Sequence, residues 1–226
     1  MGAMIDFLDG IDTQLLLFLN GANNAFFDEF FWLVTGKFAW IPMICVLLYS
    51  TFRKDWKMGA VVILGVALTI ALCDQVSSGI IKDAVCRLRP TRDPEIGGIV
   101  HIVNGYRGGQ YGFVSSHAAN SFGVAVFLAM LFRRRAFTWT IMLWAAVLSY
   151  SRIYLGVHYP GDIICGGLLG AALGAAVYCI YVKAAKLRFL SSLKVPDGRD
   201  TRWLVYATVG NMVLLLAVAT IIYVVK

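Results

Sequence analysis

The chain has 226 residues, of which 59% are hydrophobic and only 15% are charged, and its mean hydropathy of +0.74 excludes an ordinary soluble domain. The net charge of +7 does not indicate a nucleic-acid-binding protein, because the lysines and arginines stand in short runs between apolar segments. Five cysteines, most of them inside apolar stretches, argue against a disulfide framework. We therefore expect an all-α polytopic membrane helix bundle with about six transmembrane helices.

Residues 4–33 are apolar but interrupted by polar side chains. Asparagines and acidic residues stand beside a group of phenylalanines, a mixture typical of helices that lie in the membrane interface. The opening residues lack the basic and apolar regions of a secretory signal peptide, so we expect the spans themselves to direct insertion. The next two segments are predicted to cross the bilayer, from Val34 to Phe52 with Pro42 inside and from Met58 to Lys82.

A polar, glycine-containing loop follows over residues 83–116. Loops of this length are usually either functional or disordered. Four further spans are predicted beyond it, at residues 117–132, 138–154, 160–182 and 203–225. We expect one membrane-embedded domain over residues 1–226, with interfacial helices at 4–33, a catalytic bundle at 34–182 and a final span at 203–225.

Positive charges gather at one set of helix ends. Segments 53–57, 133–135 and 183–202 hold twelve lysines and arginines, whereas the long loop holds Arg87, Arg92 and Arg107 besides those considered below. Cytoplasmic ends carry the excess of basic residues, so these three segments are predicted to face the cytoplasm. The long loop and the turn after residue 154 then face the other side, which in the inner membrane of a bacterium is the periplasm.

Three clusters of ionisable residues lie at helix ends on that other side. In the first, Lys82 and Arg89 are seven residues apart on one face of a helix that Pro90 ends. A planar guanidinium and a compact ammonium together suit an anionic tetrahedral group such as phosphate. The alternative is that both side chains only extend to the lipid head groups.

The second cluster stands at the start of the 117–132 span. Ser115 and Ser116 precede this span in the position of helix N-caps, and His117 falls on its first turn. The free backbone amides of a helix start attract anions. Taken alone, however, two serines at this place indicate capping, and a histidine at a membrane boundary is often only an interfacial residue.

The third cluster contains Arg152, His158 and Asp162. Pro160 favours a helix start, and Asp162 in the first turn can reach back to the imidazole four residues before it. A carboxylate bonded to one ring nitrogen fixes the tautomer and leaves the other nitrogen free to attack. Since polar residues at membrane depth are costly unless they serve a site, three clusters at one level indicate one pocket.

The pattern K-x6-RP, then SxH, then SR-x5-H-x3-D resembles the type 2 phosphatidic acid phosphatase family, which is related to vanadium-dependent haloperoxidases. The middle motif departs from that family, because Val114 replaces its usual proline and Ser116 its usual glycine. The resemblance implies a metal-independent lipid phosphatase with a phosphohistidine intermediate. In it His158 is the nucleophile, Asp162 its orienting partner and His117 the general acid, and the phosphate is bound by Lys82, Arg89, Arg152 and Ser115, with the Ser116 backbone as a further donor.

The expected partners are a lipid phosphate and the bilayer, without nucleic acid. No further cluster of His, Cys or carboxylates shows metal-ligand spacing, so neither a metal nor another cofactor is expected. Undecaprenyl diphosphate ranks first as substrate, before phosphatidylglycerol phosphate, phosphatidic acid and a lipid A phosphate. A lipid phosphotransferase and, with less support, a transporter are the alternatives. Asp74 in the second span is interpreted as an interhelical hydrogen-bonding residue, and the glycines at 166, 170 and 174 as a packing surface.

Overall fold

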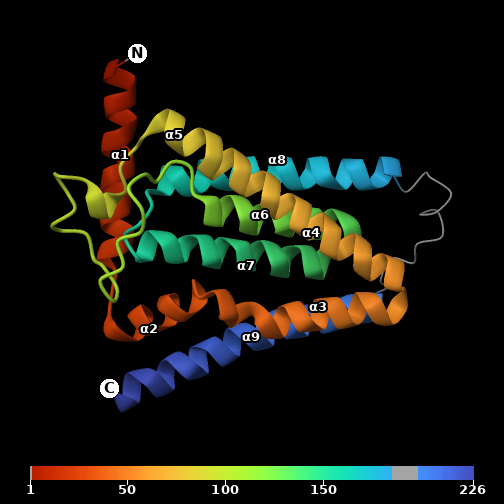
Figure 1. Ribbon diagram of the computed structural model, residues 1–226. Coiled ribbons are helices and arrows are strands. Elements are labelled where there is room, and N and C mark those ends of the chain that lie inside the picture. The colour runs from red at the N-terminus through yellow and green to blue at the C-terminus, as the bar shows by residue number, and fades with distance from the viewer. Residues whose placement is uncertain (1, 185–197) are drawn as a thin grey trace.

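In the computed structural model, residues 2–184 and 198–226 are described, and within them every regular element is a helix apart from one isolated β-bridge between Leu88 and Tyr111. The predicted all-α bundle is confirmed. Figure 1 shows its helices running side by side along one long direction. They are α3 (Ile41–Lys54), α4 (Trp56–Val76), α6 (Ser116–Phe132), α7 (Arg135–Tyr154), α8 (Pro160–Ala184) and α9 (Gly198–Val225).

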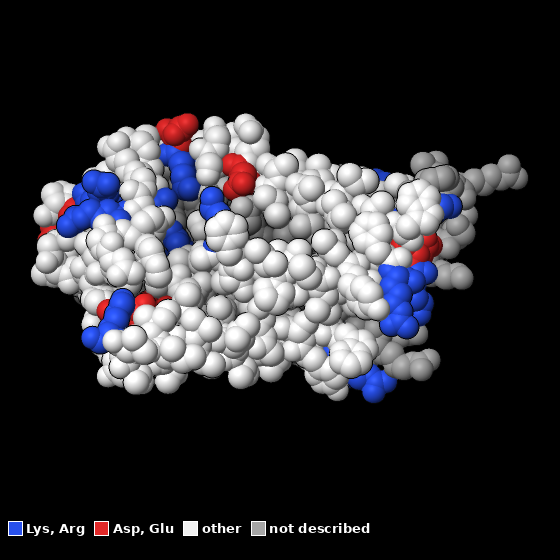
Figure 2. Space-filling view, turned by 60° about the horizontal axis from the view of Figure 1, so that its bottom comes forward, with Lys and Arg blue, Asp and Glu red and all other residues white. Residues whose placement is uncertain are grey.

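The apolar character of these helices fits a bilayer. Within the described residues, three helical stretches are long and apolar enough to cross a membrane, Trp56–Val85, Pro160–Ala184 and Thr201–Val225. A bent pair of shorter helices adds a fourth candidate. Figure 2 shows charged side chains toward the two ends and a broad uncharged belt between them. Most of the predicted basic segment 183–202 lies outside the described residues.

The N-terminal part forms two helices, α1 (Gly2–Gly21) and α2 (Ala25–Val34). Figure 1 shows α1 crossing one end of the bundle at a steep angle to the other helices, as an interfacial helix would. Asn24 begins α2, because its side chain accepts a hydrogen bond from the Phe27 amide at 2.9 Å.

The predicted first span is wrong at its N-terminal end. Residues 34–40 do not continue into α3; they close α2 and form a short 3-10 turn, Lys37–Trp40, and the chain bends by 67° between α2 and the segment that contains α3. Pro42 explains the start of α3, because a proline lacks the amide hydrogen and is tolerated in the first turn of a helix but not in its interior.

The end of the second span has a feature that the sequence did not indicate. After α4 the helix widens into a π-helical turn, Ser77–Ile81, continues as α5 (Lys82–Val85) and ends at Cys86 in the left-handed conformation. Neighbouring residues normally point about 100° apart around a helix. The widened turn instead lets Ser77 and Ser78 both contact the Ser116 hydroxyl, at 2.9 and 2.7 Å.

Small residues bring α6 and α8 together. A methyl group added to Gly166, Gly170 or Gly174 would overlap the backbone of Ser115, Ala119 or Gly123. The glycine pattern is therefore a packing surface within the chain, as predicted. It fixes the start of α6, which carries one candidate histidine, against the start of α8, which carries Asp162.

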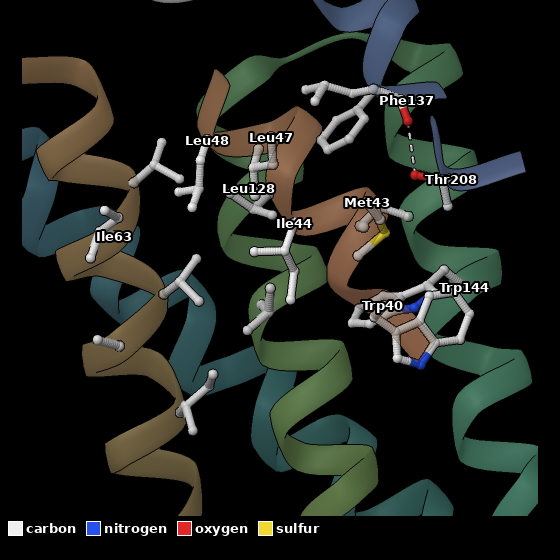
Figure 3. A pocket seen from close by; sticks show the side chains of 17 residues that line it. Trp40, Met43, Ile44, Leu47, Leu48, Ile63, Leu128, Phe137, Trp144 and Thr208 are labelled. Atoms are coloured by element: carbon white, nitrogen blue, oxygen red, sulfur yellow. Dashed lines mark hydrogen bonds between the residues drawn. The ribbon is translucent and has the colours of Figure 1, made fainter. Parts of the chain in front are cut away.

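A cavity of about 470 Å³ lies deeper in the bundle and is lined almost entirely by apolar side chains (Figure 3). Its walls include Leu47 of α3, Ile63 of α4, Leu128 of α6 and Trp144 of α7. None of the predicted site residues lines this cavity, so the clusters of ionisable residues lie elsewhere.

Candidate active site

His158 lies in the tight turn between α7 and α8. Gly156 takes a φ of +71°, which is readily adopted by glycine, and the Val157 amide donates to the Arg152 carbonyl at 3.1 Å. Asp162 in the first turn of α8 accepts from the Tyr159 amide at 3.1 Å, and the same oxygen lies 3.2 Å from His158 Nδ1. Both side chains are buried. The expected contact between carboxylate and imidazole is therefore present.

Arg89 faces the other ring nitrogen of His158. Its Nη1 lies 3.0 Å from His158 Nε2 and 3.1 Å from the Val157 carbonyl oxygen. The segment that carries Arg89 is held by backbone pairing with the far end of the long loop, through Arg89 N to Gln110 O at 3.0 Å and Gly112 N to Arg87 O at 2.8 Å. Gly112 is required here, because a Cβ atom would lie 2.9 Å from Asp162 Oδ2.

This environment keeps the imidazole neutral. Burial, followed by the positive charges of Arg89, Arg152 and Lys82, lowers the pKa of His158 well below its ordinary value. A neutral imidazole with its Nδ1 proton directed at Asp162 presents the Nε2 lone pair, which accepts from Arg89. His158 thus has the protonation state that a nucleophile needs.

Arg152 is held by residues outside the recognised motifs. Its Nη1 donates to Thr35 Oγ1 at 2.6 Å and its Nη2 to the Tyr106 hydroxyl at 3.2 Å, while its buried Nε has no partner among the described residues. Burial acts to raise the pKa of Tyr106, but the charge and hydrogen bond of Arg152, with the charge of Arg89, lower it overall. Among the described residues no hydrogen bond joins Arg152 to His158, and Arg152 acts on His158 through its charge.

Lys82 and the two serines form the adjoining part of the pocket. Lys82 Nζ donates to Ser116 Oγ at 2.8 Å, so the serine that replaces the family's usual glycine contributes a hydroxyl. Ser115 caps α6 by accepting from the Ala118 amide at 3.4 Å, and its own amide donates to the Asp162 carbonyl at 3.0 Å. Within the described residues nothing accepts from the amides of Ser116 and His117, which leaves two donors at a helix start.

His117 differs from His158 in being exposed. Its imidazole makes no hydrogen bond to any part of the chain that the structure describes. Its ring lies within electrostatic range of Arg152, His158, Arg89 and Lys82, so it shares the pocket with all of them. An exposed imidazole beside a buried one provides two histidines in different environments at one site.

Sequence reasoning missed Arg87, which connects α1 to the site. Its Nη1 contacts Asp162 Oδ1 at 3.1 Å and Asp12 Oδ2 at 2.8 Å, its Nη2 contacts Asp9 at 2.9 Å, and its guanidinium lies 4.0 Å from the Tyr159 ring centroid. Asp12 also accepts from the Gly161 amide at 2.7 Å and so caps α8. The only signal in the sequence was two aspartates, three residues apart, on the predicted interfacial helix.

The three clusters that the sequence indicated thus meet at one end of the bundle. Among residues 2–184 and 198–226, no three His, Cys, Asp or Glu side chains gather closely enough to hold a metal ion. A family model described as the PAP2 superfamily matches residues 58–186, more than half of the chain. The chain belongs to the PAP2 superfamily.

Curated relatives extend the likeness of this PAP2 protein over most of its length. It is 46% identical over 196 residues to the lipid A 4'-phosphatase of Bacteroides thetaiotaomicron, covering 85% of this chain and 86% of the relative. It is 39% identical over 181 residues to the lipid A 4'-phosphatase of Porphyromonas gingivalis, covering 80% and 77%.

A solved structure supports the fold. The PAP2-type phosphatidylglycerolphosphate phosphatase of Bacillus subtilis superposes with a TM-score of 0.57 at 20% identity, over 80% of this chain and 89% of that one. Together with the family match and the apolar helices, these likenesses make the protein an integral membrane lipid phosphatase.

Proposed function

We propose that this PAP2 enzyme removes a phosphate group from lipid A and that the reaction passes through a phosphohistidine at His158. The observation that carries the chemistry is the buried, neutral His158, which has Asp162 on Nδ1 and Arg89 on Nε2. The two relatives named as lipid A 4'-phosphatases favour lipid A over undecaprenyl diphosphate, which ranked first from sequence alone.

In the first step the Nε2 lone pair attacks phosphorus in line. Arg89 transfers its hydrogen bond from Nε2 to a phosphoryl oxygen, which frees the nucleophile as the substrate binds. The bond between phosphorus and the sugar oxygen breaks, and His117, when protonated, gives its proton to that oxygen. Asp162 stabilises the positive charge that develops on His158.

In the second step water attacks the phosphohistidine. His117, now neutral, accepts a proton from the water, and inorganic phosphate leaves as the bond between phosphorus and Nε2 breaks. Lys82, Arg89 and Arg152 offset the charge of the transferring group in both steps, and the free amides at the start of α6 provide further donors.

The test is a panel of four lipids given to detergent-purified protein: a lipid A phosphate, undecaprenyl diphosphate, phosphatidylglycerol phosphate and phosphatidic acid. Free phosphate should be released fastest from lipid A by the wild type, without any acceptor lipid and in the presence of EDTA. The variant His158→Ala should release none, because no equivalent nucleophile remains.

A control variant and a measurement that traps the phosphohistidine intermediate complete this experiment. Gln75→Leu changes an exposed side chain on α4 that makes no hydrogen bond within the described residues, and it should behave as the wild type. Quenched reactions with a substrate radiolabelled in its phosphate group should leave acid-labile label on the wild type and on Gln75→Leu but not on His158→Ala. Turnover by His158→Ala would refute the mechanism. Transfer of the phosphate to an added acceptor lipid, with no free phosphate formed, would identify a phosphotransferase.

A further inference from the structure

Polar contacts between α4 and α6 continue past Lys82 toward the middle of the bundle. Ser78 Oγ and Ser116 Oγ lie 2.7 Å apart, and Asn120 Nδ2 donates to Asp74 Oδ1 at 2.8 Å. Both partners step by four residues, so these are two successive pairs on antiparallel helices, one turn apart. Because Lys82 Nζ bonds to Ser116 and lies 3.3 Å from Ser78 Oγ, the pairs are continuous with the phosphate-binding end.

The predicted hydrogen bond of Asp74 to a neighbouring helix is present. It does not explain why a carboxylate stands at this position. Asp74 and Ser78 are exposed on a helix that is apolar enough to cross a membrane. An exposed carboxylate at such a depth is unfavourable unless it serves a binding path. Asn120 occupies Oδ1 of Asp74, and Oδ2 has no hydrogen-bond partner in the part of the chain that the structure describes. A hydrogen bond that only held α4 against α6 would need Oδ1 alone.

The position of Asp74 relative to Lys82 suggests which part of a lipid it meets. Asp74 precedes Lys82 by eight residues, so it lies about 12 Å deeper along the helix axis. A lipid that places its phosphate at Lys82 extends its backbone and the first atoms of its acyl chains in that direction. A carboxylate accepts hydrogen bonds and donates none, so a group that pairs with Oδ2 must carry an N–H or O–H.

We propose that Asp74, Asn120 and Ser78 form a lateral polar site that recognises a hydrogen-bond donor on the lipid backbone, an amide N–H or a hydroxyl. The inference rests on the proposed function and deepens it. Lipid A is built on glucosamine and carries amide and hydroxyl groups near its phosphates. A polyprenyl diphosphate carries no donor beyond its phosphates. The lateral polar site therefore favours binding of lipid A and adds nothing to the binding of a polyprenyl diphosphate.

The experiment compares kcat/KM for a lipid A phosphate and for undecaprenyl diphosphate in wild type, Asp74→Asn and Asp74→Leu. The ratio to follow is kcat/KM for the lipid A phosphate divided by kcat/KM for undecaprenyl diphosphate. Loss of the charged acceptor for a donor on the substrate should lower this ratio about ten-fold, more in Asp74→Leu than in Asp74→Asn. Gln75→Leu, at the neighbouring exposed position, is the matched control and should leave the ratio at the wild-type value. Asp74→Asn keeps the size of the side chain, so the test does not depend on the folding of Asp74→Leu.

Each outcome separates this inference from the proposed function. If the wild type is active on lipid A and the ratio is the same in Asp74→Asn, the lateral polar site is overturned and the proposed function stands. An equal loss on both lipids would also overturn it, because Asp74 would then support only what the substrates share. A wild type inactive on lipid A would overturn the proposed function, and with it the inference.

Discussion

His158 is surrounded by positive charge before any substrate binds, and this affects stability as well as chemistry. Burial and the neighbouring cations hold the pKa of His158 well below its ordinary value. In the unfolded chain a histidine takes up a proton near pH 6.5, about its reference pKa. As the pH falls through that value, the unfolded state gains a proton that the folded state does not. His158 therefore lowers the free energy of unfolding in acid and has no such effect at higher pH.

We predict that His158 of the substrate-free protein stays neutral when the pH falls from about 8 to about 6. Nuclear magnetic resonance of nitrogen-15-labelled imidazoles in detergent measures this directly, and the His158 signal is assigned by its absence in His158→Asn. The same sign of linkage predicts that His158→Asn loses less thermal stability than the wild type over this pH interval. A His158 titration midpoint at or above about 6.5 would contradict both expectations.

Contacts between residues close in sequence could be predicted from their spacing, whereas contacts between distant residues could not. Asp162 was assigned to His158 because four residues across a helix start bring the two side chains together. Arg87 was counted only as a loop charge, because its partners Asp12 and Asp162 are each 75 residues away and only the folded chain brings them together. Arg152 was likewise expected to bind phosphate, but the residues that hold it, Thr35 and Tyr106, belong to other segments.

At the scale of elements, the site depends on how closely α6 approaches α8. The glycine spacing indicated a packing surface but not its partner, which turned out to be the helix that carries His117. The start of α3 and the π-helical turn were not predicted. A proline permits either a kink or a helix start, and a single widened turn scarcely alters the hydrophobic pattern.

We predict that Gly170→Ala destabilises the protein by about 1–3 kcal/mol, because the added methyl group overlaps the Ala119 carbonyl and forces the helices apart. Activity should fall as well, since Ser115 and His117 move away from Asp162. Gly210→Ala on α9 is the matched control, because a Cβ atom there meets nothing within 4 Å. Thermal unfolding in detergent and kcat/KM measure the two effects, and equal behaviour of both variants would show that helix spacing does not control the site.

At the scale of the whole molecule, the two ends differ in charge and in role. Lys82, Arg89 and Arg152 gather with the two candidate histidines at the end that α1 crosses (Figure 1), and the Arg133–Arg135 run lies at the opposite end of α6. The excess of lysine and arginine at that opposite end was predicted from the sequence. We propose that the site end faces the periplasm of a bacterial inner membrane, because the side with more lysine and arginine in short loops stays in the cytoplasm.

One cysteine introduced at either end of the bundle tests this orientation. In a Cys86→Ser background, which removes an exposed thiol near the site, we place cysteine at Gly98 in the long loop or at exposed Arg134. A membrane-impermeant maleimide added to spheroplasts should label Gly98→Cys at once and Arg134→Cys only after lysis. The Cys86→Ser parent measures labelling of the four remaining cysteines. The reverse pattern would place the phosphate-binding end in the cytoplasm, and lipid A would then have to be dephosphorylated before it leaves the inner leaflet.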